Sequence, residues 1–158
     1  PTPPPSPSPP LSRSDNLGVQ IRLIAGSGFC LESPVPVLSP TLYAEVRMQT
    51  ATTLLIPDEH AERAVYVLEG EAQLDGEALE VHSLVVLPAG ESLALFAETD
   101  CHLVVFGGAA LDGPRRINWN FVASDPALIE QARQRWAAGD WPVVPGESER
   151  IELPGGKA

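Results

Sequence analysis

Short apolar runs separated by turn residues fill the chain from Leu17 to Phe106, and they constrain the fold more than any other feature. In "LGVQIRLIAG" (17–26), apolar residues alternate with the polar residues Gln20 and Arg22. Alternate residues of a strand share one face, so this pattern predicts strands with one buried side. Many short strands at this spacing predict an all-β sandwich or barrel. The further predicted strands lie at 41–48, 52–57, 64–70, 77–81, 84–90, 93–98 and 101–108.

One helix is predicted after the strands, in "DPALIEQARQRWAAGD" (125–140). Asp125 suits the N-cap position, Pro126 the first helical position and Gly139 the C-cap. We therefore expect a C-terminal helix near 125–138, followed by an extended tail. Its apolar residues recur at helical spacing, which indicates packing rather than cofactor binding. These residues are Leu128, Ile129, Ala132 and Trp136.

The 158 residues suffice for one domain with a sizeable core. The first ten, "PTPPPSPSPP", include seven prolines, which cannot join the interior of a sheet. We expect residues 1–16 to form a Pro-rich linker or disordered tail, and 17–158 to form the domain. Because the chain begins with Pro1 and its only methionine is Met48, we interpret it as a processed product or fragment.

The formal net charge of −11 argues against a nucleic-acid or anionic-membrane surface, since phosphates require clustered basic residues. No apolar run approaches the roughly 20 residues of a membrane span. Residues 1–10 lack the apolar core of a signal peptide. The cysteines Cys30 and Cys101 could pair, but an acidic domain of this size favours reduced thiols. We therefore expect a cytoplasmic protein.

The stretch "DEHAERAVYVLEG" (58–70) is similar to the first half of a metal-binding cupin motif. That motif has His-x-His, then Glu, then a strand that ends in Gly. A second half of the form P-x-G-x-x-H supplies the last ligand, and "VVLPAGESLALF" (85–96) matches its scaffold. Two histidines two residues apart in a strand converge on one ion, and imidazole with carboxylate suits iron, manganese, nickel or copper.

Counting back from Gly70 places the ligand positions at Ile56, Asp58, Glu62 and Leu93. Ile56 and Leu93 cannot bind a cation and would fill the barrel interior. The sequence therefore predicts a degenerate site without metal and without catalytic residues. One alternative stays open: Asp58, His60 and Glu62 share a strand face, and His102 could join them as a displaced metal site. Otherwise His60 lies in an exposed acidic turn, and His82 lies on the surface.

The chain resembles the pirin family. The resemblance rests on "RAVYVLEGE" (63–71), "LPAGESLAL" (87–95) and the stretch from 106 to 154, where "NWNFV" and "PVVPGE" occur in order. It implies a cupin-type double-stranded β-helix, or jelly-roll barrel. Pirins contain two such barrels, of which the N-terminal one holds iron and the C-terminal one has usually lost its ligands. This chain resembles the C-terminal barrel alone, so iron or another divalent transition metal is expected only in a barrel that it lacks.

The resemblance leaves the activity open between three hypotheses. The first is a pirin-like module without its own metal centre, with a structural role or a role in binding a partner or ligand. The second is one part of a quercetin 2,3-dioxygenase whose catalytic N-terminal barrel is absent from this chain. The third is a self-associating protein, because a barrel without its sister barrel would expose an apolar surface. Candidate interface residues for a sister barrel or a homodimer are Trp119, Phe121, Trp136 and Trp141.

Overall fold

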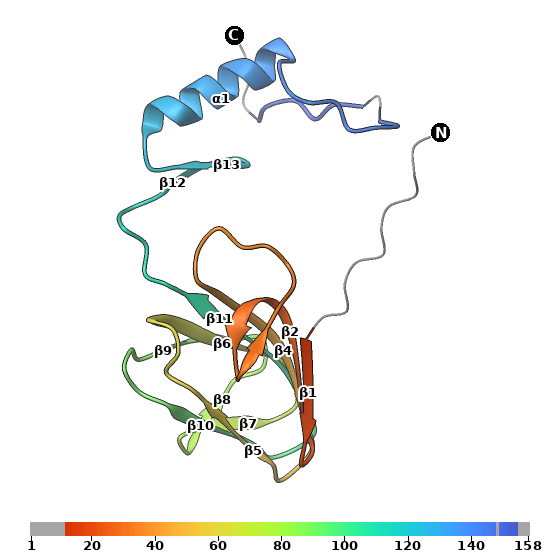
Figure 1. Cartoon of the computed structure of the whole chain (residues 1–158), viewed down its shortest axis with the longest axis vertical. Helices are drawn as coiled ribbons and strands as arrows, with labels where there is room; N and C mark the ends of the chain where they lie inside the picture. Colours follow the sequence, from red (N-terminus) through yellow and green to blue (C-terminus); the bar gives the residue numbers. More distant parts are fainter. Residues whose placement is uncertain (1–11, 148, 155–158) are drawn as a thin grey trace. The chain divides into compact units, whose positions relative to one another are not determined.

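The structure, a computed structural model, describes residues 12–147 and 149–154 (Figure 1). The chain divides into two compact units with their boundary between Ala110 and Leu111. We call them the barrel unit, up to Ala110, and the C-terminal unit, from Leu111. The single domain predicted for 17–158 therefore comprises two units. Within the described ranges, no helix has the length and apolar character needed to cross a bilayer.

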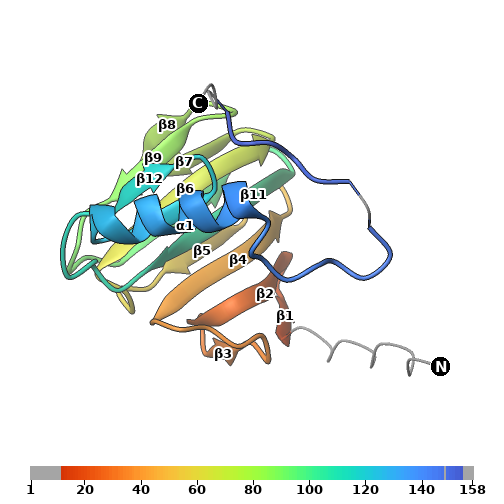
Figure 2. The same ribbon diagram turned by 90° about the horizontal axis from the view of Figure 1, so that it is seen from above.

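The barrel unit contains two antiparallel sheets, as the strand pattern predicts (Figure 2). The larger sheet has the order β1-β2-β4-β11-β6-β9, and β3 pairs with β2. Its strands are β1 (Ser12–Asn16), β2 (Val19–Gly28), β3 (Leu31–Glu32), β4 (Thr41–Met48), β6 (Glu62–Glu69), β9 (Leu84–Leu87) and β11 (Cys101–Gly108). The smaller sheet has the order β5-β10-β7-β8. Its strands are β5 (Thr53–Ile56), β7 (Ala72–Leu74), β8 (Glu77–Leu79) and β10 (Leu93–Ala97).

The core lies on the inward faces of these strands, where alternate side chains are buried. In β11, for example, Leu103 and Val105 are fully buried, whereas Val104 and Phe106 on the other face remain partly exposed. Burial of each large aliphatic side chain contributes roughly 1.5–3 kcal/mol to folding. The all-β class of the barrel unit is therefore confirmed. The alternation of apolar and polar residues that predicted the strands also places their apolar side chains in the core.

One turn and one close strand contact show how local sequence closes the barrel. Asp75 and Gly76 connect β7 to β8 with φ values of 48° and 88°, so the predicted two-residue hairpin is confirmed. In β11, a Cβ added to Gly107 would lie 2.0 Å from the carbonyl oxygen of Glu62. Only glycine therefore permits β11 and β6 to approach this closely.

The N-terminal boundary differs from the prediction. Ser12–Asn16 form β1, which pairs with β2 in a register that sets Ser12 opposite Leu23 and Asn16 opposite Val19. The segment is polar, and backbone pairing at the sheet edge requires no apolar side chain. The linker expected over 1–16 is therefore wrong for residues 12–16, and residues 1–11 lie outside the described ranges.

The C-terminal unit contains a hairpin, β12 (Arg116–Asn118) and β13 (Phe121–Ala123), followed by α1 (Pro126–Ala138). The predicted helix is confirmed together with its caps. The carboxylate of Asp125 accepts a hydrogen bond of 2.8 Å from the amide of Ala127, and Gly139 takes the left-handed conformation. Within the predicted apolar stripe, Ile129 is buried and Leu128 is exposed.

Candidate functional site

The polar centre of the barrel interior is Arg63, whose side chain is completely buried. It lies near the start of β6, on the inward face that also carries Val65 and Val67. A buried guanidinium is stable only when its charge and most of its donors are satisfied. The groups that surround Arg63 therefore determine whether a metal ion can bind at this end of the barrel.

Three backbone carbonyls and one carboxylate surround this guanidinium. Nη1 donates to the carbonyl of Pro57 at 2.7 Å, and Nη2 donates to those of Pro88 at 2.6 Å and Glu91 at 2.8 Å. Nη2 also lies 3.5 Å from Oδ1 of Asp58, whereas Nε has no hydrogen-bond partner within the described residues. These bonds join the β5–β6 and β9–β10 connections, so Arg63 fastens two loops across the barrel end.

Three of the four predicted ligand positions lie beside these loops. Ile56 and Leu93 are directly opposite one another in β5 and β10, and both are buried in the core. Asp58 follows β5, and its Oδ1 accepts a hydrogen bond of 3.1 Å from the amide of Gly90. These three positions therefore share one end of the barrel, as the motif requires.

The prediction that Glu62 occupies an inward ligand position is wrong. Glu62 is exposed, because the inward positions of β6 are 63, 65 and 67. Arg63 therefore takes the inward place that the motif reserves for a carboxylate. Strand parity counted from Val65 and Val67 would have identified it.

This set of side chains does not fit a divalent metal. Two aliphatic residues offer no lone pair, one carboxylate is already bonded, and the guanidinium places a positive charge where a cation would bind. The cofactor that the fold suggests thus disagrees with the residues present, and no chemical step through a metal follows from this barrel.

The displaced metal site is not assembled either. Glu62 pairs with Gly108 and His102 lies beside Glu69, so Glu62 and His102 lie at opposite ends of the β6–β11 pair. Within residues 12–147 and 149–154, no group of three or more His, Cys, Asp or Glu side chains could hold an ion. Asp58, His60, Glu62 and His102 do not converge.

His60 also differs from the exposed position expected for it. It is 9% exposed, and its Nε2 lies 2.8 Å from the carbonyl oxygen of Ser27, to which it donates. Nearby, the carboxylate of Glu59 accepts a hydrogen bond of 3.0 Å from the amide of Phe29. The loop before β6 thus packs on the β2–β3 hairpin, which buries His60. His82 is exposed, as predicted.

The two cysteines differ in their exposure, since Cys30 is exposed and Cys101 is buried. Cys30 and Cys101 are unpaired, which confirms the expectation of free thiols. Burial raises the pKa of the Cys101 thiol above its ordinary range, although hydrogen bonding with Thr99 acts in the opposite direction. Cys101 is therefore a buried structural thiol.

The aromatic residues predicted at an interface pack on one another within the C-terminal unit. The ring centroids of Trp119 and Trp136 are 5.1 Å apart, and those of Phe121 and Trp141 are 5.8 Å apart and stacked. The guanidinium of Arg135 lies 5.1 Å from the Trp141 ring centroid. These side chains form the small core of this unit, and only Trp141 is notably exposed, at 38%.

Comparison with known proteins identifies the family. Residues 43–142 match the pirin C-terminal cupin domain. A pirin-like protein of Caulobacter vibrioides is 38% identical over 125 residues, which cover 79% of this chain and 43% of the relative. A crystal structure of quercetin 2,3-dioxygenase from Acinetobacter baumannii matches with a TM-score of 0.79 and 25% identity, and covers 91% of this chain and 50% of that one.

The extent of these matches defines the part of the family that the chain represents. The chain spans less than half the length of the curated relative and half of the solved enzyme. The matched domain begins within β4 and extends beyond the end of α1 to Pro142. The chain belongs to the pirin family and corresponds to its C-terminal cupin domain.

Proposed function

We propose that this chain is a pirin-type cupin module without its own metal centre, which acts by packing against a partner rather than by catalysis. The observation that carries the proposal is Arg63, a buried guanidinium bonded to Pro57, Pro88 and Glu91 at the predicted metal position. A metal-dependent oxidation requires an ion with exchangeable ligands. The residues at the predicted ligand positions, Ile56, Asp58, Glu62 and Leu93, provide none of the imidazoles that such an ion needs.

The outward face of the larger sheet supplies a surface for the partner. An open, largely apolar groove of about 670 Å³ crosses β4, β11 and β6. Tyr43, which lines it from β4, is 42% exposed. An apolar face of this kind on a sheet is a candidate interaction surface. The residues that line it include Tyr43, Tyr66, Leu68, Val104 and Phe106.

The occupant that we propose for this groove is a second cupin barrel. Its support is the length of the relatives, because the matching quercetin 2,3-dioxygenase is twice as long as the part that this chain covers. A sister barrel on the same polypeptide or a second copy of this chain would both bury the groove. The free thiols of Cys30 and Cys101 support a reducing, cytoplasmic location for the module.

Metal analysis of the purified chain tests the proposal. After dialysis against iron, nickel and copper salts in turn, each metal should remain far below one equivalent per chain. Near-stoichiometric retention of any of them in the barrel would contradict the proposal.

A second candidate function is a part of a quercetin 2,3-dioxygenase, favoured by the likeness to the Acinetobacter baumannii enzyme. In that case the metal and the reaction belong to another barrel. The chain alone, supplied with quercetin, dioxygen and a divalent metal, should consume no oxygen. A gene that encodes a His-x-His barrel next to this sequence would support this second function, and its absence would oppose it.

A further inference from the structure

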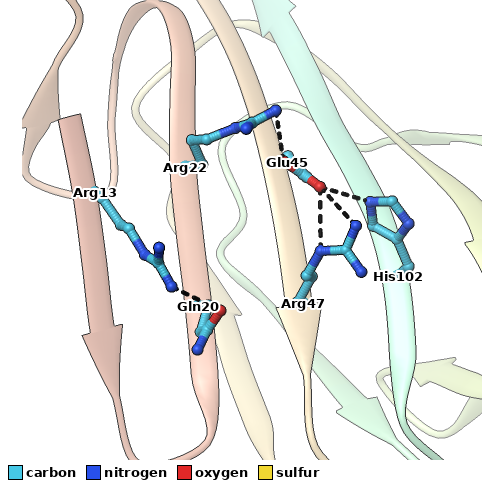
Figure 3. Close-up of polar contacts among 6 residues, drawn as sticks. All are labelled: Arg13, Gln20, Arg22, Glu45, Arg47 and His102. Atoms are coloured by element: carbon cyan, nitrogen blue, oxygen red, sulfur yellow. Dashed lines mark hydrogen bonds and ion pairs between the residues drawn. The ribbon is translucent and has the colours of Figure 1, made fainter. Parts of the chain in front are cut away.

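The surface positive charge of the barrel unit is gathered on one patch. Residues 1–110 contain fourteen acidic residues but only four arginines and no lysine. One of these arginines, Arg63, is buried. The other three lie on the outward face of β1, β2 and β4, with His102 beside them on β11 (Figure 3). We call Arg13, Arg22, Arg47 and His102 the basic patch.

Strand register places two like charges against one another in this patch, because Arg13 is directly opposite Arg22. Arg47 is directly opposite His102. Like charges in directly opposite positions destabilise a sheet unless opposite charges lie beside them. Glu45 offsets part of this repulsion, because its carboxylate binds Arg22 at 2.9 Å, Arg47 at 3.0 Å and His102 at 2.9 Å.

Donors remain available at the Arg13 end of the patch. Arg13 and Arg22 are 58% and 54% exposed in their side chains. Arg13 donates from Nη2 to Gln20 at 2.9 Å and lies 3.7 Å from the carboxylate of Asp15 through the same nitrogen, and Arg22 contacts Glu45 through Nη2. Among the described residues, neither guanidinium has a further hydrogen-bond partner for Nη1. Guanidinium groups of this kind bind carboxylate and phosphate oxygens in pairs.

Two adjoining cavities give the patch the dimensions of a small-molecule site. One of about 180 Å³ is lined by Arg13, Arg22 and Glu45, and one of about 370 Å³ is lined by His102, Glu69 and Asp100. The two share Gln20 and Arg47. The larger volume lies within the range of ligand pockets, roughly 300–1,000 Å³.

The carboxylates of the groove fix the orientation of a ligand. The larger cavity, which Arg13 and Arg22 do not line, carries Asp15, Glu69 and Asp100, and Asp100 is engaged by the amide and hydroxyl of Thr50 at 2.8 and 2.9 Å. A second anionic group would be repelled in that cavity. We propose that this groove binds a small polar molecule with one anionic head group, a carboxylate or a phosphate, whose oxygens contact Arg13 and Arg22. This proposal is independent of the proposed function.

Calorimetric titration of the full chain with inorganic phosphate, gluconate and glucose tests the site. Saturable binding of phosphate or gluconate, with none of neutral glucose, is expected, and the better of the two anions identifies the head group. Arg22→Gln and Arg13→Gln should each weaken binding about tenfold, the usual effect of losing a charge-assisted hydrogen bond. Glu45→Gln should strengthen it, because a competing carboxylate is removed.

Matched variants separate this site from a general effect of net charge. Arg116→Gln removes one exposed arginine from the C-terminal unit, and Glu77→Gln removes one carboxylate from the β7–β8 hairpin. Both should bind the anion as the parent chain does. The proposal is overturned if neither anion saturates below about 50 mM, a concentration that already represents weak binding. It is also overturned if the matched variants change affinity as much as the patch variants.

Discussion

Nη2 of Arg63 lies 3.5 Å from Oδ1 of Asp58 at the end of the barrel where the motif would place a metal. The same nitrogen donates to the carbonyls of Pro88 and Glu91. A metal at this position would draw ligands from several strands to one point. The guanidinium of Arg63 likewise joins several segments at one point. It is a cation that is part of the chain, and it binds backbone oxygens instead of imidazoles.

Arg63→Met should destabilise the barrel strongly. The substitution leaves three backbone carbonyls and a carboxylate without the buried donor, and loss of one member of a buried polar network costs roughly 3–5 kcal/mol. Urea unfolding followed by circular dichroism would measure this as a lower transition midpoint. Arg116→Gln, which alters an exposed arginine of β12, should change the free energy of unfolding by less than about 0.5 kcal/mol. Equal effects would contradict the structural role of Arg63.

Removal of the guanidinium should allow a metal site to be restored. The triple variant Ile56→His, Arg63→Glu and Leu93→His, together with Asp58, would offer two imidazoles and two carboxylates. It should bind Ni²⁺ in equilibrium dialysis. The double variant Ile56→His and Leu93→His keeps Arg63 and should bind at least about tenfold more weakly, a difference of about 1.4 kcal/mol. If both bind equally, the charge of Arg63 does not exclude the metal.

The sequence predicted the parts of this fold in which side-chain pattern and backbone agree. Alternation identified the strands that face the core, and Asp125 and Gly139 marked the ends of α1. β1 was missed because a polar edge strand leaves no apolar pattern. The β12–β13 hairpin was missed because its turn uses Trp119 at a φ of 51° in place of glycine.

The candidate site was predicted less completely than the fold. Ile56 and Leu93 were found because aliphatic residues at ligand positions are visible in the sequence. Arg63 was missed because arginine is almost always exposed, so its burial depends on partners that only the folded loops provide. The basic patch was missed for a related reason, since its members come from four strands and meet only through the sheet register.

Glu45 should make the barrel sensitive to acid. Burial alone would raise the pKa of its carboxyl, but the hydrogen bond and charge of Arg47, the charge of Arg22 and the bond to His102 lower it overall. When a carboxyl has a lower pKa in the folded state than in the unfolded state, its ionised form stabilises the fold. This contribution is complete at pH values above the unfolded-state pKa of about 4.3, and it is lost as the pH falls through the folded-state pKa.

Unfolding measured between about pH 5 and pH 3 therefore tests the role of Glu45. The free energy of unfolding should fall less steeply with decreasing pH in Glu45→Gln than in the parent chain. Glu77→Gln, in the β7–β8 hairpin, removes a carboxylate without disturbing this network. An unchanged slope in Glu45→Gln would show that the network does not couple folding to pH.

The groove on the larger sheet should cause the isolated chain to self-associate. Leu68 lines this groove on β6, whereas Leu38 is fully exposed in the loop before β4. A charged side chain in the groove would have to be desolvated on association, which is unfavourable without a partner. Leu68→Glu should therefore shift the chain toward the monomer in sedimentation velocity, and Leu38→Glu should not. A parent chain that stays monomeric at high concentration, or equal shifts in both variants, would argue against the groove as a docking surface.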